Sequence, residues 1–97
     1  MATRNKTRNA TRKFRTAITT VETYHTDVMS AFNDCADVAG RFDYFVDFDN
    51  AIERDCADNT VSFSYPVLNN DNDIVTWLHC AYYTMCSGRI ELTAYCG

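Results

Sequence analysis

The sequence predicts an α+β fold: one long N-terminal amphipathic helix packed on a four-stranded antiparallel sheet. Apolar residues recur at helical spacing through residues 10–39 and at alternate positions through most of the remaining chain. A length of 97 residues, with 46% hydrophobic and 23% charged residues, fits one small globular domain. We therefore expect a flexible basic arm over residues 1–9 and a single α+β domain over residues 10–97.

The helix prediction rests on a wide apolar stripe. At 100° per residue, eleven apolar side chains fall on one arc, and the opposite arc is rich in Thr and Asp; the apolar set is Phe14, Ala17, Ile18, Val21, Tyr24, Val28, Met29, Phe32, Cys35, Ala36 and Ala39. Gly40 is suitably placed to end the helix. The many threonines lower the intrinsic helix propensity, so packing has to hold the helix together.

Four strands are expected after the helix. Apolar and polar residues alternate over residues 41–49, 61–67, 74–86 and 90–96, while residues 50–60 are a polar connection. Residues 74–86 also fit a helix capped by Asp73, but their β-branched and aromatic content favours a strand.

The turns predict how these strands pair. A tight turn at Ser87-Gly88 sets Met85 opposite Ile90, and the loop at 69–73 sets Tyr65 opposite Trp77. This register assigns the core face of 74–86 to Val75, Trp77, His79, Ala81, Tyr83 and Met85. The outer face would then carry Leu78, Cys80, Tyr82, Phe45 and Tyr95, which suggests a partner surface or a homodimer.

Charge is strongly segregated along the chain. Residues 1–15 hold six cations and no acid, a charge of +6, and residues 16–97 hold thirteen acids and three arginines, a charge of −10. The cations are Arg4, Lys6, Arg8, Arg12, Lys13 and Arg15. Eight acids crowd one stretch in the middle: Asp34, Asp37, Asp43, Asp47, Asp49, Glu53, Asp55 and Asp58. We expect these acids to form a face that meets a cationic partner.

Recognisable catalytic and metal-binding motifs are missing from the sequence. The five cysteines include no C-x-x-C pair, and the pattern fits a reduced, cytoplasmic protein of the host cell. His25 and His79 both fall on predicted core faces, so we expect structural roles for them. The apolar runs are too short to span a membrane. We expect no enzyme activity, no cofactor and no metal.

Two functions remain. In the first, the acidic face and the aromatics Tyr44, Phe45, Tyr82 and Tyr95 dock on the basic groove of a nucleic-acid-binding complex, where carboxylates replace phosphates. In the second, the basic arm binds nucleic acid directly, which the acidic body disfavours. In size and charge over its whole length, the chain resembles small proteins of phages and mobile elements, in particular inhibitors of the anti-CRISPR type. This resemblance implies an inhibitor that blocks a nucleoprotein complex; a dimeric structural phage protein is the further alternative.

Overall fold

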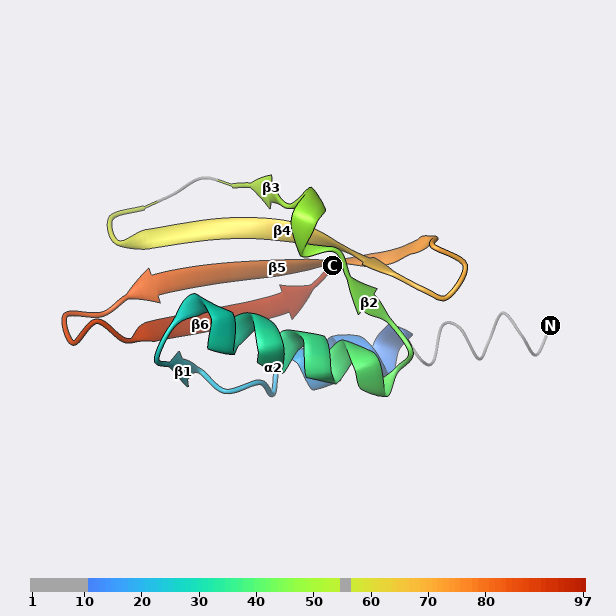
Figure 1. Cartoon of the computed structure of the whole chain (residues 1–97), viewed down its shortest axis with the longest axis horizontal. Coiled ribbons are helices and arrows are strands. Elements are labelled where there is room, and N and C mark those ends of the chain that lie inside the picture. Colours follow the sequence, from blue (N-terminus) through green and yellow to red (C-terminus); the bar gives the residue numbers. More distant parts are fainter. Residues whose placement is uncertain (1–10, 55–56) are drawn as a thin grey trace.

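The computed structural model describes residues 11–54 and 57–97. Within these residues, the helical segment 11–18, helix α2 (Val28–Arg41) and the short 3₁₀ helix η1 (Phe48–Asn50) accompany a curled antiparallel sheet. Figure 1 shows α2 running along the sheet, with segment 11–18 beside its C-terminal half. The α+β class is confirmed, but the predicted architecture of one long helix on four strands is wrong.

The predicted helix 10–39 is broken after residue 18, in a stretch that contains several threonines. The hydroxyls of Thr19 and Thr20 donate to the carbonyls of Thr16 and Ala17, each at 2.7 Å. The backbone N–H groups of Thr19 and Thr20 bond the same two carbonyls in a tightened last turn, and the helix ends there. The break makes room for the two-residue strand β1 (Tyr24–His25).

A new helix begins after Asp27, which is an N-cap that the sequence analysis overlooked. Its carboxylate accepts a hydrogen bond from the Ser30 backbone N–H at 2.8 Å. The helix continues through Gly40, which was expected to stop it, and ends at Arg41. The reversal follows at Asp43, whose φ of 58° lies in the left-handed region.

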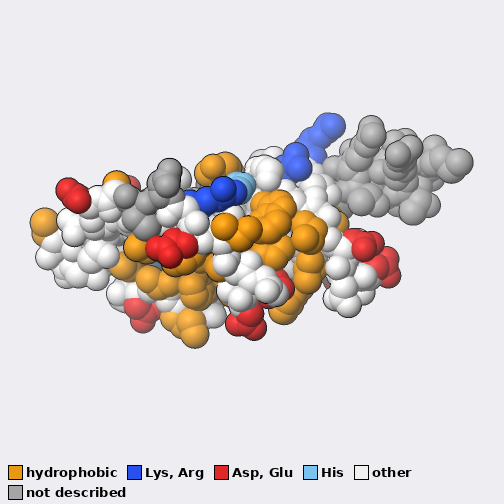
Figure 2. All heavy atoms as spheres, turned by 90° about the horizontal axis from the view of Figure 1, so that it is seen from above, with side chains coloured by type: hydrophobic (Ala, Val, Ile, Leu, Met, Phe, Trp, Pro, Cys, Tyr) orange, Lys and Arg blue, Asp and Glu red, His pale blue; other side chains and the backbone are white. Residues whose placement is uncertain are grey.

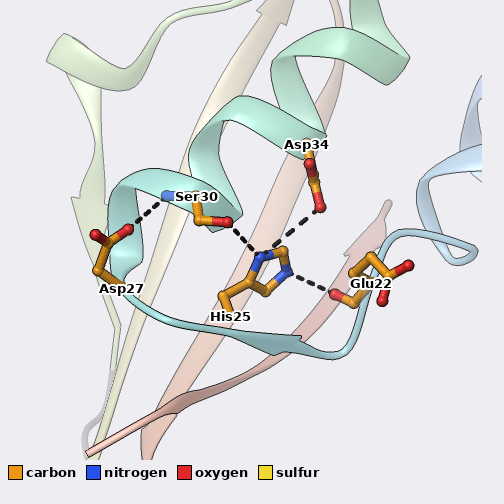
Figure 3. Close-up of polar contacts among 5 residues, drawn as sticks. All are labelled: Glu22, His25, Asp27, Ser30 and Asp34. Atoms are coloured by element: carbon orange, nitrogen blue, oxygen red, sulfur yellow. Dashed lines mark hydrogen bonds and ion pairs between the residues drawn. The ribbon is translucent and has the colours of Figure 1, made fainter.

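His25 ties the broken segment together (Figure 3). Its Nε2 lies 2.7 Å from the Glu22 carbonyl oxygen and therefore carries the ring proton, while Nδ1 lies 3.0 Å from the Ser30 hydroxyl. The Asp34 carboxylate lies 3.7 Å from the same Nδ1. His25 is 3% exposed, so the expected structural role is confirmed.

The described strands form one sheet of six in the order β1-β6-β5-β4-β2, with β3 also paired to β4. The long strands are β4 (Thr60–Leu68), β5 (Ile74–Thr84) and β6 (Ile90–Cys96). Strand β5 confirms the strand prediction over its helical rival. The predicted strand 41–49 shrinks to β2 (Phe45–Val46), because α2 and η1 take its two ends, and β3 (Ile52–Glu53) lies in the expected connection.

The predicted register of β5 is wrong by one residue, and its two faces are therefore exchanged. Leu68 pairs with Ile74, but a bulge then shifts the register so that Tyr65 pairs with Leu78 instead of Trp77. At the other end, Met85 N–H donates to the Arg89 carbonyl, closing a three-residue loop with Gly88 at φ 88°. The loop sets Thr84, in place of Met85, opposite Ile90.

The core lies between the helices and the face of β5 that points toward them. This inner face presents Thr76, Leu78, Cys80 and Tyr82, all of them buried. Phe14 and Ile18 of segment 11–18 are fully buried, and α2 contributes Ala31, Cys35, Val38 and Ala39. Trp77, His79, Ala81 and Tyr83, predicted for the core, instead face away from α2.

Adjacent tyrosines on β5 test the register directly. Tyr82 is 2% exposed and its hydroxyl lies 2.8 Å from that of Tyr65, whereas Tyr83 is 39% exposed. We expect Tyr82→Ala to lower the free energy of unfolding by about 3–5 kcal/mol and Tyr83→Ala by about 1 kcal/mol or less. Urea unfolding followed by circular dichroism measures both.

If Tyr82→Ala is too unstable to purify, Tyr82→Phe and Tyr83→Phe form the milder pair. Tyr82→Phe should cost about 1 kcal/mol, because the buried hydroxyl of Tyr65 loses its partner, and Tyr83→Phe should cost little. A larger loss from the Tyr83 variants than from the Tyr82 variants would contradict the register.

Candidate functional site

The predicted acidic face is spread over several surfaces. Asp34 and Asp37 line a shallow hollow beside Arg41, Asp47 and Asp49 line a second hollow, and Glu53 lines a third. Asp43 and Asp58 are exposed in turns, and Asp55 lies outside the described residues. Figure 2 shows acidic side chains in separate groups around a hydrophobic area. The seven acids that the structure describes therefore lie in separate hollows and turns.

The second hollow combines acids with aromatic side chains. It measures about 320 Å³ and is lined by Ala36, Tyr44, Phe45, Val46, Asp47, Phe48 and Asp49, and we call these residues the acidic–aromatic surface. Phe45 is 64% exposed. Aromatic side chains are enriched in protein interfaces, where a few of them carry much of the binding energy.

Rigid elements hold this surface in place. Strand β2 pairs with β4, so that Val46 is buried opposite Val67 while the neighbouring Phe45 remains exposed. The Phe48 ring stacks on Phe32 of α2 with 4.7 Å between ring centroids, which fixes η1. The Asp47 carboxylate accepts a hydrogen bond from the Asn50 side-chain amide at 2.6 Å.

Not all of the predicted aromatic anchors belong to this surface. Tyr44 is half-buried and lines the hollow, with its hydroxyl 3.1 Å from that of Thr11. Tyr82, expected on the outer face, is buried in the core and cannot contact a partner. Tyr95 is 55% exposed but lines the separate hollow that contains Glu53.

The basic residues fall into two groups. Arg4, Lys6 and Arg8 lie outside the described residues, together with the predicted arm 1–9. Arg12, Lys13 and Arg15 are exposed on segment 11–18, around the fully buried Phe14. This part of the predicted basic set is therefore anchored to the domain.

The sheet face that points away from α2 carries a polar cluster that the sequence analysis missed. Arg54 Nε donates to the Ser64 hydroxyl at 2.9 Å, and Ser64 Oγ lies 2.6 Å from His79 Nδ1. The His79 ring packs on Tyr95 with 4.9 Å between ring centroids. The three strands β4, β5 and β6 supply Ser64, His79 and Tyr95 in one row, because these residues pair directly.

This cluster forms one side of a hollow of about 570 Å³, which we call the sheet hollow. The next row of the sheet holds only the small residues Ser62, Ala81 and Thr93, and all three line the hollow. The exchanged register explains why the cluster was missed: His79 was assigned to the core. The alternation of Ser62 and Ser64 in β4 was the available signal, since polar residues at every second position mark the face away from the core.

Two of the cysteines that face the core, Cys35 and Cys96, have thiols with raised pKa values. Cys35 is 1% exposed, and its hydrogen bond with Cys80 together with burial raises the pKa of its thiol. Burial also raises the pKa of Cys96 to about 12. Since the thiolate is the reactive form, these thiols are poor nucleophiles at neutral pH. In the described ranges, His, Cys, Asp and Glu side chains do not gather into a group that could hold a metal ion.

Comparisons with known protein families, with curated proteins and with solved structures found no match to this chain. None of the helices in residues 11–54 and 57–97 combines the length and apolarity needed to cross a membrane. Function therefore has to be inferred from the side chains themselves.

Thiol labelling tests the burial of the cysteines. Cys86 is exposed in the β5–β6 turn, whereas Cys35 and Cys80 lie between α2 and the sheet. With iodoacetamide at neutral pH, we expect Cys86 to be modified in the native protein and Cys35 and Cys80 only after denaturation. Peptide mass spectrometry distinguishes the sites. Modification of Cys35 at the rate of Cys86 without denaturant would contradict the packing of α2 on β5.

Proposed function

We propose that this protein is a non-enzymatic binding module that docks its acidic–aromatic surface on a basic, nucleic-acid-binding surface of another protein. The observation that carries the proposal is the exposed Phe45 beside Asp47 and Asp49 on a rigidly held hollow. In this role the protein would act as an inhibitor of the anti-CRISPR type, occupying a groove that otherwise holds nucleic acid.

Charge complementarity defines the partner. Residues 16–97 carry a charge of −10, and such a domain is attracted to clusters of Lys and Arg that normally hold phosphates. The carboxylates of Asp47 and Asp49 would compete with phosphate oxygens for these cations. Phe45 would add the desolvated apolar anchor that carries much of the affinity in protein interfaces.

The burial of Ser64 supports a binding role over a catalytic one. Its hydroxyl lies within hydrogen-bond distance of a histidine, as in nucleophilic enzymes, but Ser64 has no exposed surface. A nucleophile needs access to its substrate. Arg54 Nε also donates a hydrogen bond to the Ser64 hydroxyl oxygen, so this oxygen already accepts a hydrogen bond from a cationic side chain.

A second candidate function rests on Arg12, Lys13 and Arg15. These three cations are exposed on segment 11–18, and the described part of that segment contains no acid. They could hold phosphates through charge alone, so that binding would be strongly weakened by salt. The acidic body opposes this contact, and we therefore place it second.

Matched charge reversals separate these functions. We expect Asp47→Lys with Asp49→Lys to abolish retention of a nucleoprotein complex from a nuclease-treated host lysate, because repulsion replaces attraction. Asp71→Lys with Asp73→Lys makes the same charge change in the exposed β4–β5 loop and should retain the complex. Phe45→Ala removes the anchor without changing charge and should weaken retention at least ~10-fold.

Affinity capture with quantitative mass spectrometry measures retention, and circular dichroism confirms that each variant is folded. Equal retention by the Asp47/Asp49 and Asp71/Asp73 variants would contradict the proposal. Loss of binding only with Arg12→Glu and Lys13→Glu, together with recovery of nucleic acid before nuclease treatment, would establish the second candidate instead.

A further inference from the structure

We propose that the sheet hollow binds a small aromatic anion, meaning a planar ring that bears a phosphate or carboxylate group. This site is separate from the acidic–aromatic surface and does not depend on the function proposed above. The sheet hollow has the volume of a small-molecule site, about 570 Å³, and its lining is both polar and apolar.

The hydrogen-bond chain orients the His79 ring. An arginine Nε can only donate, so Ser64 Oγ accepts from Arg54, and in the proposed arrangement the Ser64 hydroxyl directs its own hydrogen to Nδ1 of His79. This tautomer carries the ring proton on Nε2. No described residue lies within hydrogen-bond distance of Nε2, and His79 lines the hollow. The cluster thus presents an oriented N–H donor to a ligand.

The other polar groups of the lining also suit an anion. The positive charge of Arg54 lies in the same wall, and the hydroxyls of Ser62, Thr93 and Tyr95 can each donate. Glu53 is the acid among the described residues that line the hollow, and the chain after residue 15 is acidic overall. Repulsion from these carboxylates limits the charge that the hollow can accept, which favours a single anionic group over a nucleic-acid strand.

Tyr95 supplies a platform for the ring. It is 55% exposed although its ring packs on His79, so one aromatic surface remains open to solvent. The neighbouring row of small residues, with Ala81 at its centre, leaves space for a planar group beside this ring. Offset stacking on the Tyr95 ring adds to the gain from burial, and the anionic group would reach the Arg54–His79 wall.

The fluorescence of Trp77 can be used to measure ligand binding to the sheet hollow. This residue is the single tryptophan of the chain, is half-buried, and lies two residues before His79 on the same face of β5. The two aromatic anions to be tested are adenosine 5′-monophosphate and nicotinate. Adenosine and inorganic phosphate, which are the two halves of adenosine 5′-monophosphate, are tested separately. We expect an aromatic anion to change Trp77 fluorescence with saturation and each half to bind at least ~10-fold more weakly.

Two variants locate the site. Tyr95→Ala removes the platform at an exposed position, and His79→Phe keeps a ring but removes the Nε2 donor. Each should weaken binding of the anion at least ~10-fold. Tyr83→Ala, on the same face but outside the lining, and Asp47→Lys with Asp49→Lys should leave binding unchanged.

Failure of both aromatic anions to bind at millimolar concentration would overturn the proposal. So would equal binding of inorganic phosphate, tighter binding of a DNA oligonucleotide than of the monophosphate, or binding that Tyr95→Ala leaves intact. If His79→Phe is unfolded because Ser64 loses its acceptor, Tyr95→Ala still decides the result. Binding by one of the two anions and not the other supports the proposal and identifies the anionic group.

Discussion

The side-chain direction of β5 decides what each face of the sheet can do. Strand β5 pairs with both β4 and β6, and a shift of one residue exchanges all of its side chains between the faces. Two local irregularities set the direction: the bulge between Val67 and Leu68, and the three-residue turn with Gly88 in a left-handed conformation. The turn at one end and the bulge at the other impose the same side-chain orientation. The residues of β5 between them therefore alternate between the two faces without a further shift. The core and the sheet hollow both follow from this orientation.

The observed orientation of the β5 side chains is the one that allows a well-packed core. On the inner face, Leu78, Cys80 and Tyr82 are buried in one core cluster with the small residues Ala31, Cys35 and Ala39 of α2. Tyr82 brings a hydroxyl into the core, but Tyr65 supplies its partner, and a satisfied polar pair costs far less than an isolated one. The same orientation leaves His79 outside the core, where its Nδ1 pairs with the Ser64 hydroxyl and Arg54 donates to the same hydroxyl. One residue remains unmatched: within the described chain, the buried Thr76 hydroxyl has no hydrogen-bond partner.

Periodicity in the sequence predicted the elements better than their pairing. The strands near residues 61–67, 74–86 and 90–96 and the apolar face of α2 follow from simple alternation and helical spacing. The helix break could have been predicted, because Asp27 is a strong N-cap and Thr19 and Thr20 precede it. The bulge could not, since an extra residue in one strand leaves the alternation on either side intact. That error moved His79 into the expected core and hid the sheet hollow, whereas the acidic–aromatic surface was predicted in part through Phe45, Asp47 and Asp49.

The two proposed surfaces have opposite preferences although they belong to one acidic domain. Net charge acts over a distance, but at physiological ionic strength the field of exposed charges decays over about 8 Å. Within that range, contact partners decide affinity. At the acidic–aromatic surface the nearest groups are carboxylates beside Phe45, which favour a cationic protein surface. In the sheet hollow they are the Arg54 guanidinium and the Nε2 donor of His79, held by a serine without exposed surface. A donor set held in place by hydrogen bonds can therefore select a small anion where the overall charge would repel a large one.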